Sequence, residues 1–470
     1  MTLVAPDPLT RRCLSQRRKA LGDALDGKPA LIFAGLPRPR NYAAAAYPFR
    51  ASSHFVYLAG LSIPGAAILL HGDRATLFAP PHDPDHALWH GDEPDPDEIA
   101  AWIGCHHAPL GALPAALAAL APMTLPTPDL AGCAAASRLL GRSIAPGRLD
   151  DRDRPLALAM ICARLIHDEA AVAHLRLAAD AAARAFSAGL AATRPDRPER
   201  DVRAAMIGAL LAEGLEPSFS PIVSVHGEVL HNPSSRGVMR SGDLLLVDFG
   251  AESEGGWASD VTRTWPVSGR YSPTQRAIVE VVLAAQAAAI DALAPGARYL
   301  DVHLTACRAL AAGLVDLGIL RGDVDGIVED GLHALFLPHG LGHLLGLDVH
   351  DMEDLGDLAG YAQGRARSAQ FGLGYLRLDR DLTPGMALTI EPGFYQVPAL
   401  LAPDSPLAMR AGDRLDRARL ADFADVRGVR IEDDLLITPD GGEPLTRAIP
   451  KQINEIEHLM AGDLQPQEAP

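Results

Sequence analysis

Residues 244–265, LLLVDFGAESEGGWASDVTRTW, decide how the C-terminal part of this chain folds. Two apolar runs with the composition of β-strands flank the turn-forming segment 253–256, which predicts a hairpin centred near Glu254. Each run carries one aspartate, and we expect Asp248 and Asp260 to lie opposite one another, with Cβ atoms about 5 Å apart. Carboxylates at that spacing can share cations, but aspartates near turns are also common surface residues.

A dense group of histidines follows in residues 337–351, LPHGLGHLLGLDVHD. The spacing of His339 and His343 resembles HExxH, but Gly-Leu-Gly separates them without a glutamate, so a helical zinc-protease motif is a poor match. In an extended segment the same spacing returns both side chains to one face. Two interpretations of these residues and His350 stay open: core histidines with satisfied hydrogen bonds, or members of a polar site.

Two glutamates stand in strand-like runs near the C-terminus, Glu391 in TIEPGFY and Glu432 in GVRIEDDLLIT. A buried carboxylate without a partner is costly, so positive charge should face each of them. Arg430 is two residues from Glu432 and projects from the same side of a strand, which also fits a structural ion pair. Glu391, directly before Pro-Gly, also fits a strand end at the surface.

If the three segments meet, four carboxylates and one imidazole converge on a single point. Such a buried cluster is untenable without compensating charge, because neighbouring carboxylates force one another to protonate. Two divalent cations would balance the four negative charges. An oxygen-rich set with one imidazole favours manganese, with cobalt, iron and zinc as alternatives. The four carboxylates would be those of Asp248, Asp260, Glu391 and Glu432, and the imidazole would come from one of the three histidines.

Composition excludes several classes of partner. The 470 residues carry a formal charge of −17, which disfavours nucleic acid and anionic membranes. Five scattered cysteines without a CxxC pair indicate neither a disulfide framework nor a cysteine zinc site. The N-terminus lacks a signal-peptide pattern, and no apolar run is long enough to span a bilayer. We therefore expect a cytoplasmic protein.

The pattern of helices and strands predicts two domains, residues 1–155 and 156–460, separated by the charged segment APGRLDDRDRP at 145–155. The first reads as α/β, with strands at 29–33, 66–70 and 74–78. The second has helices and strands in blocks, which indicates an α+β class. Its expected helices are 161–192, 200–213, 272–293 and 299–317, and its expected strands are 222–225, 244–249, 387–391 and 429–438.

Four segments together resemble the signature segments of the aminopeptidase P and prolidase family: DFGAESEGGWASDVTRT, PHGLGHLLGLDVHD, TPGMALTIEPGFY and GVRIEDD. YPFRASSHFVYLAGL (47–61) and HALWHGDEP (86–94) resemble its N-terminal domain, so the resemblance spans roughly residues 28–460. It implies a C-terminal pita-bread (creatinase/aminopeptidase-like) catalytic domain behind a smaller α/β N-terminal domain. It also implies a homodimer or higher homo-oligomer.

Carried onto matching positions, the resemblance implies a dinuclear metallopeptidase with five metal ligands: Asp248, Asp260, His343, Glu391 and Glu432. It also implies that water activated by the two ions would attack the bond before proline and that Glu391 would handle the proton of this water. His350 would stabilise the oxyanion or bind the substrate carbonyl. His339 and His231 would line the pocket for proline, and Arg430 would support Glu432. Trp89 would reach the active site of a neighbouring subunit. Asp248 and Asp260 are twelve residues apart, one more than expected, and the extra residue is placed in the turn 254–256.

The substrate is expected to be a peptide with proline in second position. Arg377 stands where prolidases keep an arginine for the free proline carboxylate, with Arg380 as a competitor for that role. The long segment 397–427 also looks prolidase-like, so Xaa-Pro dipeptides are the preferred prediction and longer Xaa-Pro peptides the alternative. A metal-free binding module and a hydrolase of the creatine-cleaving type are outside alternatives, which the full ligand set disfavours.

Overall fold

The computed structural model of this chain describes residues 3–42, 44–81, 88–89 and 91–463. The chain forms two compact units, one from Met1–His174 with Met352–Ala359 and the other from Leu175–Asp351 with Gly360–Pro470. The units divide later than residue 155 because α7 (Arg154–Leu165) packs on α1 (Pro8–Ala24) inside the first unit. The domain boundary at 155 stays a prediction. Among the described helices, none combines the length and apolar character needed to cross a membrane.

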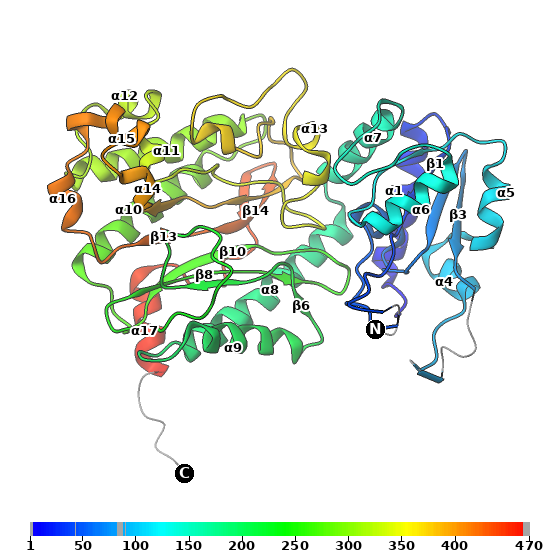
Figure 1. Cartoon of the computed structure of the whole chain (residues 1–470), viewed down its shortest axis with the longest axis horizontal. Coiled ribbons are helices and arrows are strands. Elements are labelled where there is room, and N and C mark those ends of the chain that lie inside the picture. The colour runs from blue at the N-terminus through cyan, green and yellow to red at the C-terminus, as the bar shows by residue number, and fades with distance from the viewer. Residues whose placement is uncertain (1–2, 43, 82–87, 90, 464–470) are drawn as a thin grey trace, which may run out of the picture. The chain divides into compact units, whose positions relative to one another are not determined.

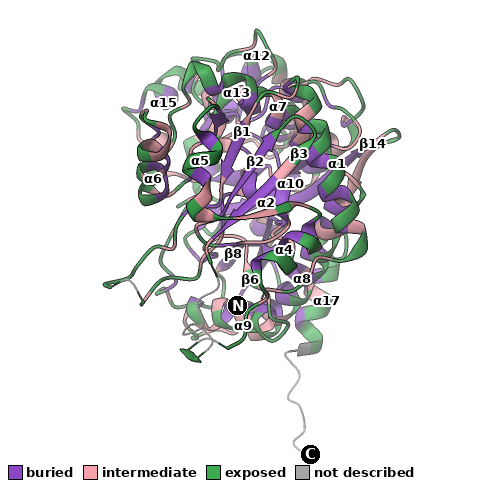
Figure 2. Ribbon diagram, turned by 90° about the vertical axis from the view of Figure 1, so that its right-hand side faces the viewer, coloured by how far each residue is buried: buried purple, intermediate pink, exposed green. Residues whose placement is uncertain are grey.

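The N-terminal unit is built on a mixed five-stranded sheet in the order β4-β3-β2-β1-β5. Each expected strand is present within a residue of its predicted bounds, and Figure 2 shows that these strands are largely buried. The strands are β1 (Ala30–Phe33), β2 (Ala67–His71), β3 (Arg74–Ala79), β4 (His106–Pro109) and β5 (Met123–Thr124). The described helices of this unit besides α1 and α7 include α2 (Ser53–Ala59), α4 (Pro96–Ile103), α5 (Leu113–Leu117) and α6 (Leu130–Leu140).

The C-terminal unit contains two three-stranded sheets, in the orders β10-β8-β7 and β11-β14-β15, and two strand pairs, β12-β13 and β6-β9. Its strands are β6 (Glu216–Pro217), β7 (Ile222–Ser224), β8 (Leu244–Phe249), β9 (Ala251–Glu252), β10 (Val261–Pro266), β11 (Ala387–Ile390), β12 (Gly393–Tyr395), β13 (Gly428–Arg430), β14 (Asp433–Thr438) and β15 (Gly441–Pro444). Its helices include α8 (Glu169–Ala192, which begins in the first unit), α9 (Glu199–Leu211), α10 (Pro273–Asp291), α11 (Tyr299–Asp316), α12 (Val324–Glu329) and α17 (Ile453–Asp463).

Helices lie against these sheets (Figure 1), and large buried side chains make the contacts between them. Phe186 of α8 meets Phe249 of β8 and Trp265 of β10 edge to face, with ring centroids 6.3 and 6.2 Å away. On α10, the Gln286 amide donates hydrogen bonds to the carbonyl oxygens of Ile390 (3.3 Å) and Ile431 (3.1 Å). Helix α10 therefore fixes the segments that carry Glu391 and Glu432, which follow these two residues in the chain.

Two predicted elements are interrupted. The helix expected over 161–192 is broken between α7 and α8, because Ile166 is extended and the Asp168 carboxylate accepts a hydrogen bond from the Ala171 N–H (2.9 Å) at the start of α8. The strand expected over 429–438 is divided into β13 and β14 around Glu432, whose N–H donates to the Thr262 carbonyl (3.0 Å). The segment 397–427 contains three short helices, α14 (Pro398–Leu401), α15 (Pro406–Ala411) and α16 (Arg417–Ala421).

Candidate metal centre

The β8-β10 hairpin carries both predicted aspartates on one face, but not directly opposite each other. Asp248 pairs with Thr262, so Asp260 is its diagonal neighbour. Direct opposition was therefore a wrong prediction, because the hairpin is centred on Gly255 and not on Glu254. The Asp248 charge still acts strongly on Asp260, which places the two carboxylates in one electrostatic cluster.

The two strands of this hairpin keep a regular register as far as the turn. Ser259 N–H donates to the Ala251 carbonyl (2.9 Å) and Ser253 N–H to the Trp257 carbonyl (2.8 Å), which continues the register of the strands. Within residues 248–262, all of them described, there is no bulge, and the location of the extra residue in the turn 254–256 stays a prediction. A Cβ on Gly250 would clash with the Ser259 carbonyl oxygen, so only glycine permits this close approach.

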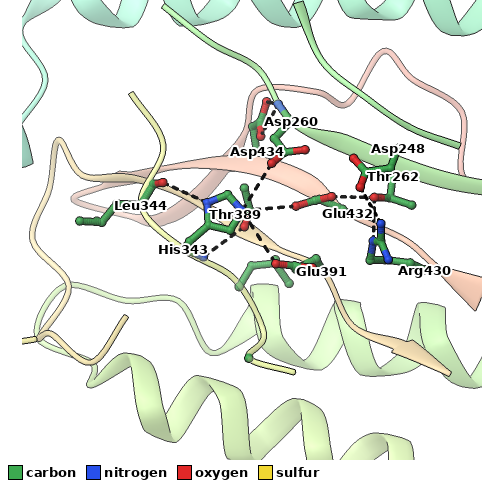
Figure 3. Close-up of polar contacts among 12 residues, drawn as sticks. Asp248, Asp260, Thr262, His343, Leu344, Thr389, Glu391, Arg430, Glu432 and Asp434 are labelled. Carbon is green, nitrogen blue, oxygen red and sulfur yellow. Dashed lines mark hydrogen bonds and ion pairs between the residues drawn. The ribbon is translucent and has the colours of Figure 1, made fainter. Parts of the chain in front are cut away.

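His343 points one ring nitrogen at three carboxylates (Figure 3). Its Nε2 lies 3.4 Å from Asp260, 3.8 Å from Glu391 and 3.9 Å from Glu432. Its Nδ1 lies 3.0 Å from the Leu344 carbonyl oxygen, which can only accept, so Nδ1 carries the proton and the Nε2 lone pair faces the carboxylates. This is the tautomer that a metal-binding histidine needs.

The backbone around His343 is held in place by its neighbours. The His343 N–H donates to the Thr389 hydroxyl (3.2 Å), and the Thr389 N–H donates to the His343 carbonyl (3.0 Å). A Cβ on Gly342 would clash with the Thr389 carbonyl oxygen and the Tyr299 hydroxyl, so glycine lets this segment lie against β11. The Gly-Leu-Gly spacer therefore serves backbone packing.

Thr262 and Arg430 organise the other side of the cluster. The Thr262 hydroxyl donates to Glu432 Oε2 (2.7 Å) and accepts from Arg430 Nε (2.9 Å). Arg430 Nη2 donates to Asp248 Oδ2 (2.6 Å), and Nη1 donates to the Tyr395 hydroxyl (3.1 Å). Every one of these side chains is buried.

Glu391 and His339 meet at the edge of the same cluster. Glu391 Oε2 lies 3.7 Å from His339 Nδ1, which donates to the Gly340 carbonyl (2.8 Å). His339 Nε2 accepts from the Tyr395 hydroxyl (2.9 Å). Burial and the nearby Arg430 charge lower the pKa of His339 to about 3, so this imidazole is neutral at pH 7.

The negative charges of the cluster repel one another. Desolvation is the largest cause that raises the pKa of Asp260, Glu391 and Glu432 well above the ordinary carboxyl value. Repulsion among the carboxylates is the next cause, and Arg430 offsets only part of it. With protein charges alone, burial and mutual repulsion therefore disfavour the ionised form of these carboxylates.

The donor set fits divalent cations. Asp248 Oδ1 is buried and has no hydrogen-bond partner among the described residues, and His343 Nε2 faces groups that only accept when ionised. Cations satisfy these lone pairs and remove the repulsion. Asp260, His343 and Glu432 also form a compact set of possible ligand atoms, all within 4.8 Å of one another. The structure thus brings together all five residues predicted as ligands, and their role as ligands stays a proposal.

The predicted site residues that are not expected to be metal ligands lie at different distances from the carboxylate cluster. The His350 ring packs edge-on against His343, with centroids 4.3 Å apart. Arg377 is half-buried, and its charge acts on Glu391, His339 and His231, which puts it near the cluster. Trp89 is 77% exposed in the N-terminal unit, and its predicted contact with a neighbouring subunit stays a prediction. Residues 86, 87 and 90 of the segment around it lie outside the described residues.

Supporting residues escaped the sequence argument. Thr262, Thr389 and Tyr395 hold the predicted site residues, and the Asp434 carboxylate accepts from the Asp260 N–H (3.2 and 3.1 Å). A signal existed only for Thr262, which shares a strand face with Asp260. The others come from separate segments and carry no local pattern.

Comparisons with known proteins agree with this geometry. The chain matches metallopeptidase family M24 over residues 173–439 and the aminopeptidase P N-terminal domain over residues 14–122. A probable Xaa-Pro aminopeptidase of Penicillium rubens is 34% identical over 432 residues, 88% of each chain. Xaa-Pro aminopeptidase 1 of Streptomyces coelicolor is 32% identical and covers 95% of this chain and 86% of its own length.

Solved structures extend the match to the whole fold. Pseudomonas aeruginosa aminopeptidase PepP superposes with a TM-score of 0.77 at 30% identity, over 98% of this chain and 99% of that one. Escherichia coli aminopeptidase P in complex with substrate gives 0.76 at 30% identity, over 96% and 98%. The predicted fold, a pita-bread domain behind a smaller N-terminal domain, is confirmed. The chain is a metallopeptidase and belongs to the aminopeptidase P family.

Proposed function

We propose that this protein is an Xaa-Pro aminopeptidase, which removes the N-terminal residue from peptides that carry proline in second position. The observation that carries the proposal is the convergence of Asp260, Glu391 and Glu432 on His343 Nε2 at 3.4–3.9 Å. It occurs in a chain that matches Xaa-Pro aminopeptidases over nearly its full length. The substrate complex of the Escherichia coli relative supports a peptide substrate.

The proposed cofactor is a pair of divalent ions, with Mn²⁺ favoured because oxygen donors dominate the site. Asp248, Asp260, His343, Glu391 and Glu432 would hold them. When bound, such ions supply Lewis-acid chemistry, because they lower the pKa of water and polarise a peptide carbonyl. A zinc-substituted Escherichia coli aminopeptidase P shows that a relative accepts another divalent ion.

Glu391 is the proposed proton carrier. It is the cluster's most exposed glutamate, with 17% of its side chain accessible, against 3% for Glu432. Glu391 is therefore more accessible to a water molecule and a substrate than Glu432 is. Glu391 would take the proton of the attacking water and return it to the departing proline nitrogen.

The role proposed for each histidine follows from its surroundings. His339 is neutral, and the Gly340 carbonyl and the Tyr395 hydroxyl hold both ring nitrogens, so it shapes the proline side of the site and does not supply a proton. His350, half-buried against His343, is the proposed donor toward the developing oxyanion. His231 is exposed near the Arg430 and Arg377 charges, and we place it at the substrate entrance.

The preference for dipeptides lacks support. It rested on Arg377 and on the segment 397–427, and the relatives matched along the chain are named Xaa-Pro aminopeptidases. The alternative therefore fits better. Arg377 remains near enough to act electrostatically on Glu391, so its influence on a free proline carboxylate is worth measuring directly.

The test is initial-rate hydrolysis of Ala-Pro-Ala, Ala-Pro and Ala-Ala-Ala by protein stripped with a chelator and reloaded with Mn²⁺. We expect Ala-Pro-Ala to be cleaved fastest, Ala-Pro slowly and Ala-Ala-Ala not at all, and each rate to vanish without metal. Faster cleavage of Ala-Pro would instead show a dipeptidase. No cleavage of either proline peptide in Mn²⁺, Co²⁺ or Zn²⁺ would overturn the proposal.

A further inference from the structure

A second group of potential metal-binding side chains lies in the C-terminal unit. His303 and Cys307 stand one turn apart on α11, and His333 faces them from the short 3-10 helix Leu332–Leu335. Their exposed fractions are 1%, 0% and 0%. Their possible ligand atoms all lie within 4.8 Å of one another, and His303 Nε2 is 3.4 Å from Cys307 Sγ.

Several polar atoms of this cluster lack partners. His303 Nδ1 and both ring nitrogens of His333 are buried without a hydrogen bond to any described residue. Proteins rarely leave buried polar atoms in this state, because burial removes their hydrogen bonds to water. Desolvation lowers the pKa of His303 to about 3 and that of His333 to about 4, so both rings are neutral at pH 7 and keep a free lone pair.

The donor chemistry differs from that of the carboxylate centre. One thiol and two imidazoles make a soft set that contains no carboxylate, which favours Cu⁺ or Zn²⁺ over Mn²⁺. Around a zinc ion with bonds of about 2.0–2.3 Å, ligand atoms lie roughly 3.3–3.7 Å apart. The His303–Cys307 pair already meets that spacing, and the bound of 4.8 Å leaves His333 within a shift of about 1 Å.

We propose that His303, Cys307 and His333 form a second metal site, separate from the carboxylate centre, for a thiophilic closed-shell ion, Cu⁺ or Zn²⁺. Binding breaks the S–H bond of Cys307, the sulfur keeps the electron pair and binds the ion, and the proton leaves to solvent. Cu⁺ with this thiolate gives a neutral buried site, whereas Zn²⁺ leaves one positive charge and takes a water as fourth ligand. The proposal does not rest on the peptidase function.

The expected consequence is a cross-link within the fold. The ion would tie α11 to the segment that continues from His333 to His339 and His343. An ion that binds only the folded state raises its stability. Bound Cu⁺ or Zn²⁺ should therefore raise the melting temperature of the full chain without joining the catalytic ligands.

The test starts from the full-length Mn²⁺-loaded protein, to which Co²⁺ is added as a spectroscopic substitute for zinc. We expect a thiolate-to-cobalt charge-transfer band, which the carboxylate centre cannot produce because it has no sulfur ligand. Cys307→Ser should abolish the band. Cys133→Ser, which removes another buried thiol, should keep it. Absence of the band in the wild type, or its persistence in Cys307→Ser, would overturn the site.

A second measurement identifies the ion and guards against misfolding of the serine variant. The protein is incubated with excess Zn²⁺, or with excess Cu⁺ under reducing anaerobic conditions. It is then passed over a desalting column in the presence of a weak chelator, which removes loosely bound ions. Wild type should retain about one additional ion per chain and gain melting temperature, and His333→Leu should do neither. Retention of copper or of zinc identifies the ion. Equal retention in both proteins, or none in either, would contradict the proposal.

Discussion

Arg430 Nη2 donates a 2.6 Å hydrogen bond to Asp248 Oδ2, and both side chains are buried. This contact leaves Asp248 Oδ1 without a partner among the described residues, directed to the carboxylate cluster. The Arg430 guanidinium also donates hydrogen bonds to the hydroxyls of Thr262 and Tyr395, so one side chain orients groups from β8, β10 and β12. Arg430 is thus a positioning residue, and the planar fork of its guanidinium carries that role.

Arg430→Lys should weaken Mn²⁺ binding and kcat/KM by about 10–100-fold, the usual effect of losing an outer partner of a metal ligand. A lysine keeps the charge but cannot hold three acceptors in one plane. The measurements are calorimetric Mn²⁺ titration and tripeptide kinetics. Arg142→Lys, at an arginine bidentate to buried Asp153, is the matched control and should leave both unchanged. Equal Mn²⁺ affinity in all three proteins would refute the positioning role.

Asp260→Asn and His343→Ala should each abolish turnover, with a loss greater than the roughly 100-fold expected for an outer partner. Asparagine keeps the shape of Asp260 but removes its charge, and alanine removes the Nε2 lone pair of His343. Bound manganese, measured by elemental analysis, should fall with activity. Asp425→Asn alters an exposed carboxylate that accepts from Ser272 and should behave as wild type. Near-normal activity in either site variant would remove that residue from the centre.

Short-range patterns predicted most of the fold because its elements are locally encoded. β8 (Leu244–Phe249) matches its predicted bounds, since its apolar run and the following turn are both contiguous in sequence. The break near Ile166 was missed although Asp168 caps the following helix locally, and a distant partner also holds it. The break at Glu432 was missed because it depends on a distant partner. Asp168 is bound by Arg17, and the Glu432 backbone is bound by Thr262. Neither contact leaves a trace in the local periodicity.

The residues of the candidate site also fall into those that local sequence predicted and those that only the fold reveals. Residues with rare chemistry in short motifs, such as His343 and Glu391, were visible in sequence. Tyr395 and Asp434 were not, because a tyrosine after Pro-Gly and a second aspartate after Glu432 are ordinary residues until the chain brings them to His339 and Asp260. His303 and Cys307 have helical spacing, but only the fold adds His333.

Gly342→Ala should lower both melting temperature and activity, because its Cβ would clash with backbone of β11 and push the His343 segment away. Gly208, inside α9 with open space around its Cβ position, provides a control. Gly208→Ala should stabilise the protein by about 0.5–1 kcal/mol through helix propensity. Differential scanning calorimetry on both variants checks the sign. A Gly342→Ala protein as stable and active as wild type would show that the segment can move freely.

Buried His333 should make stability fall in mild acid. Its folded pKa is about 4, against an ordinary value of 6.5. Between these values the unfolded chain binds the proton and the folded chain does not. The stabilisation is therefore complete above pH 6.5 and lost as pH falls toward 4, by about 1.4 kcal/mol per unit and roughly 3 kcal/mol in all.

His333→Leu removes this proton-linked term, so stability should fall less steeply between pH 6.5 and 4 in the variant than in wild type. The measurement is denaturant unfolding across that range, with copper and zinc removed so that metal release does not add its own pH dependence. His226→Leu, at an exposed histidine, is the control and should follow the wild-type slope. Parallel pH profiles for wild type and His333→Leu would mean that folding does not lower the pKa of His333, because the ring has a hydrogen-bond partner in solution. That result would also weaken the case for a metal at this cluster.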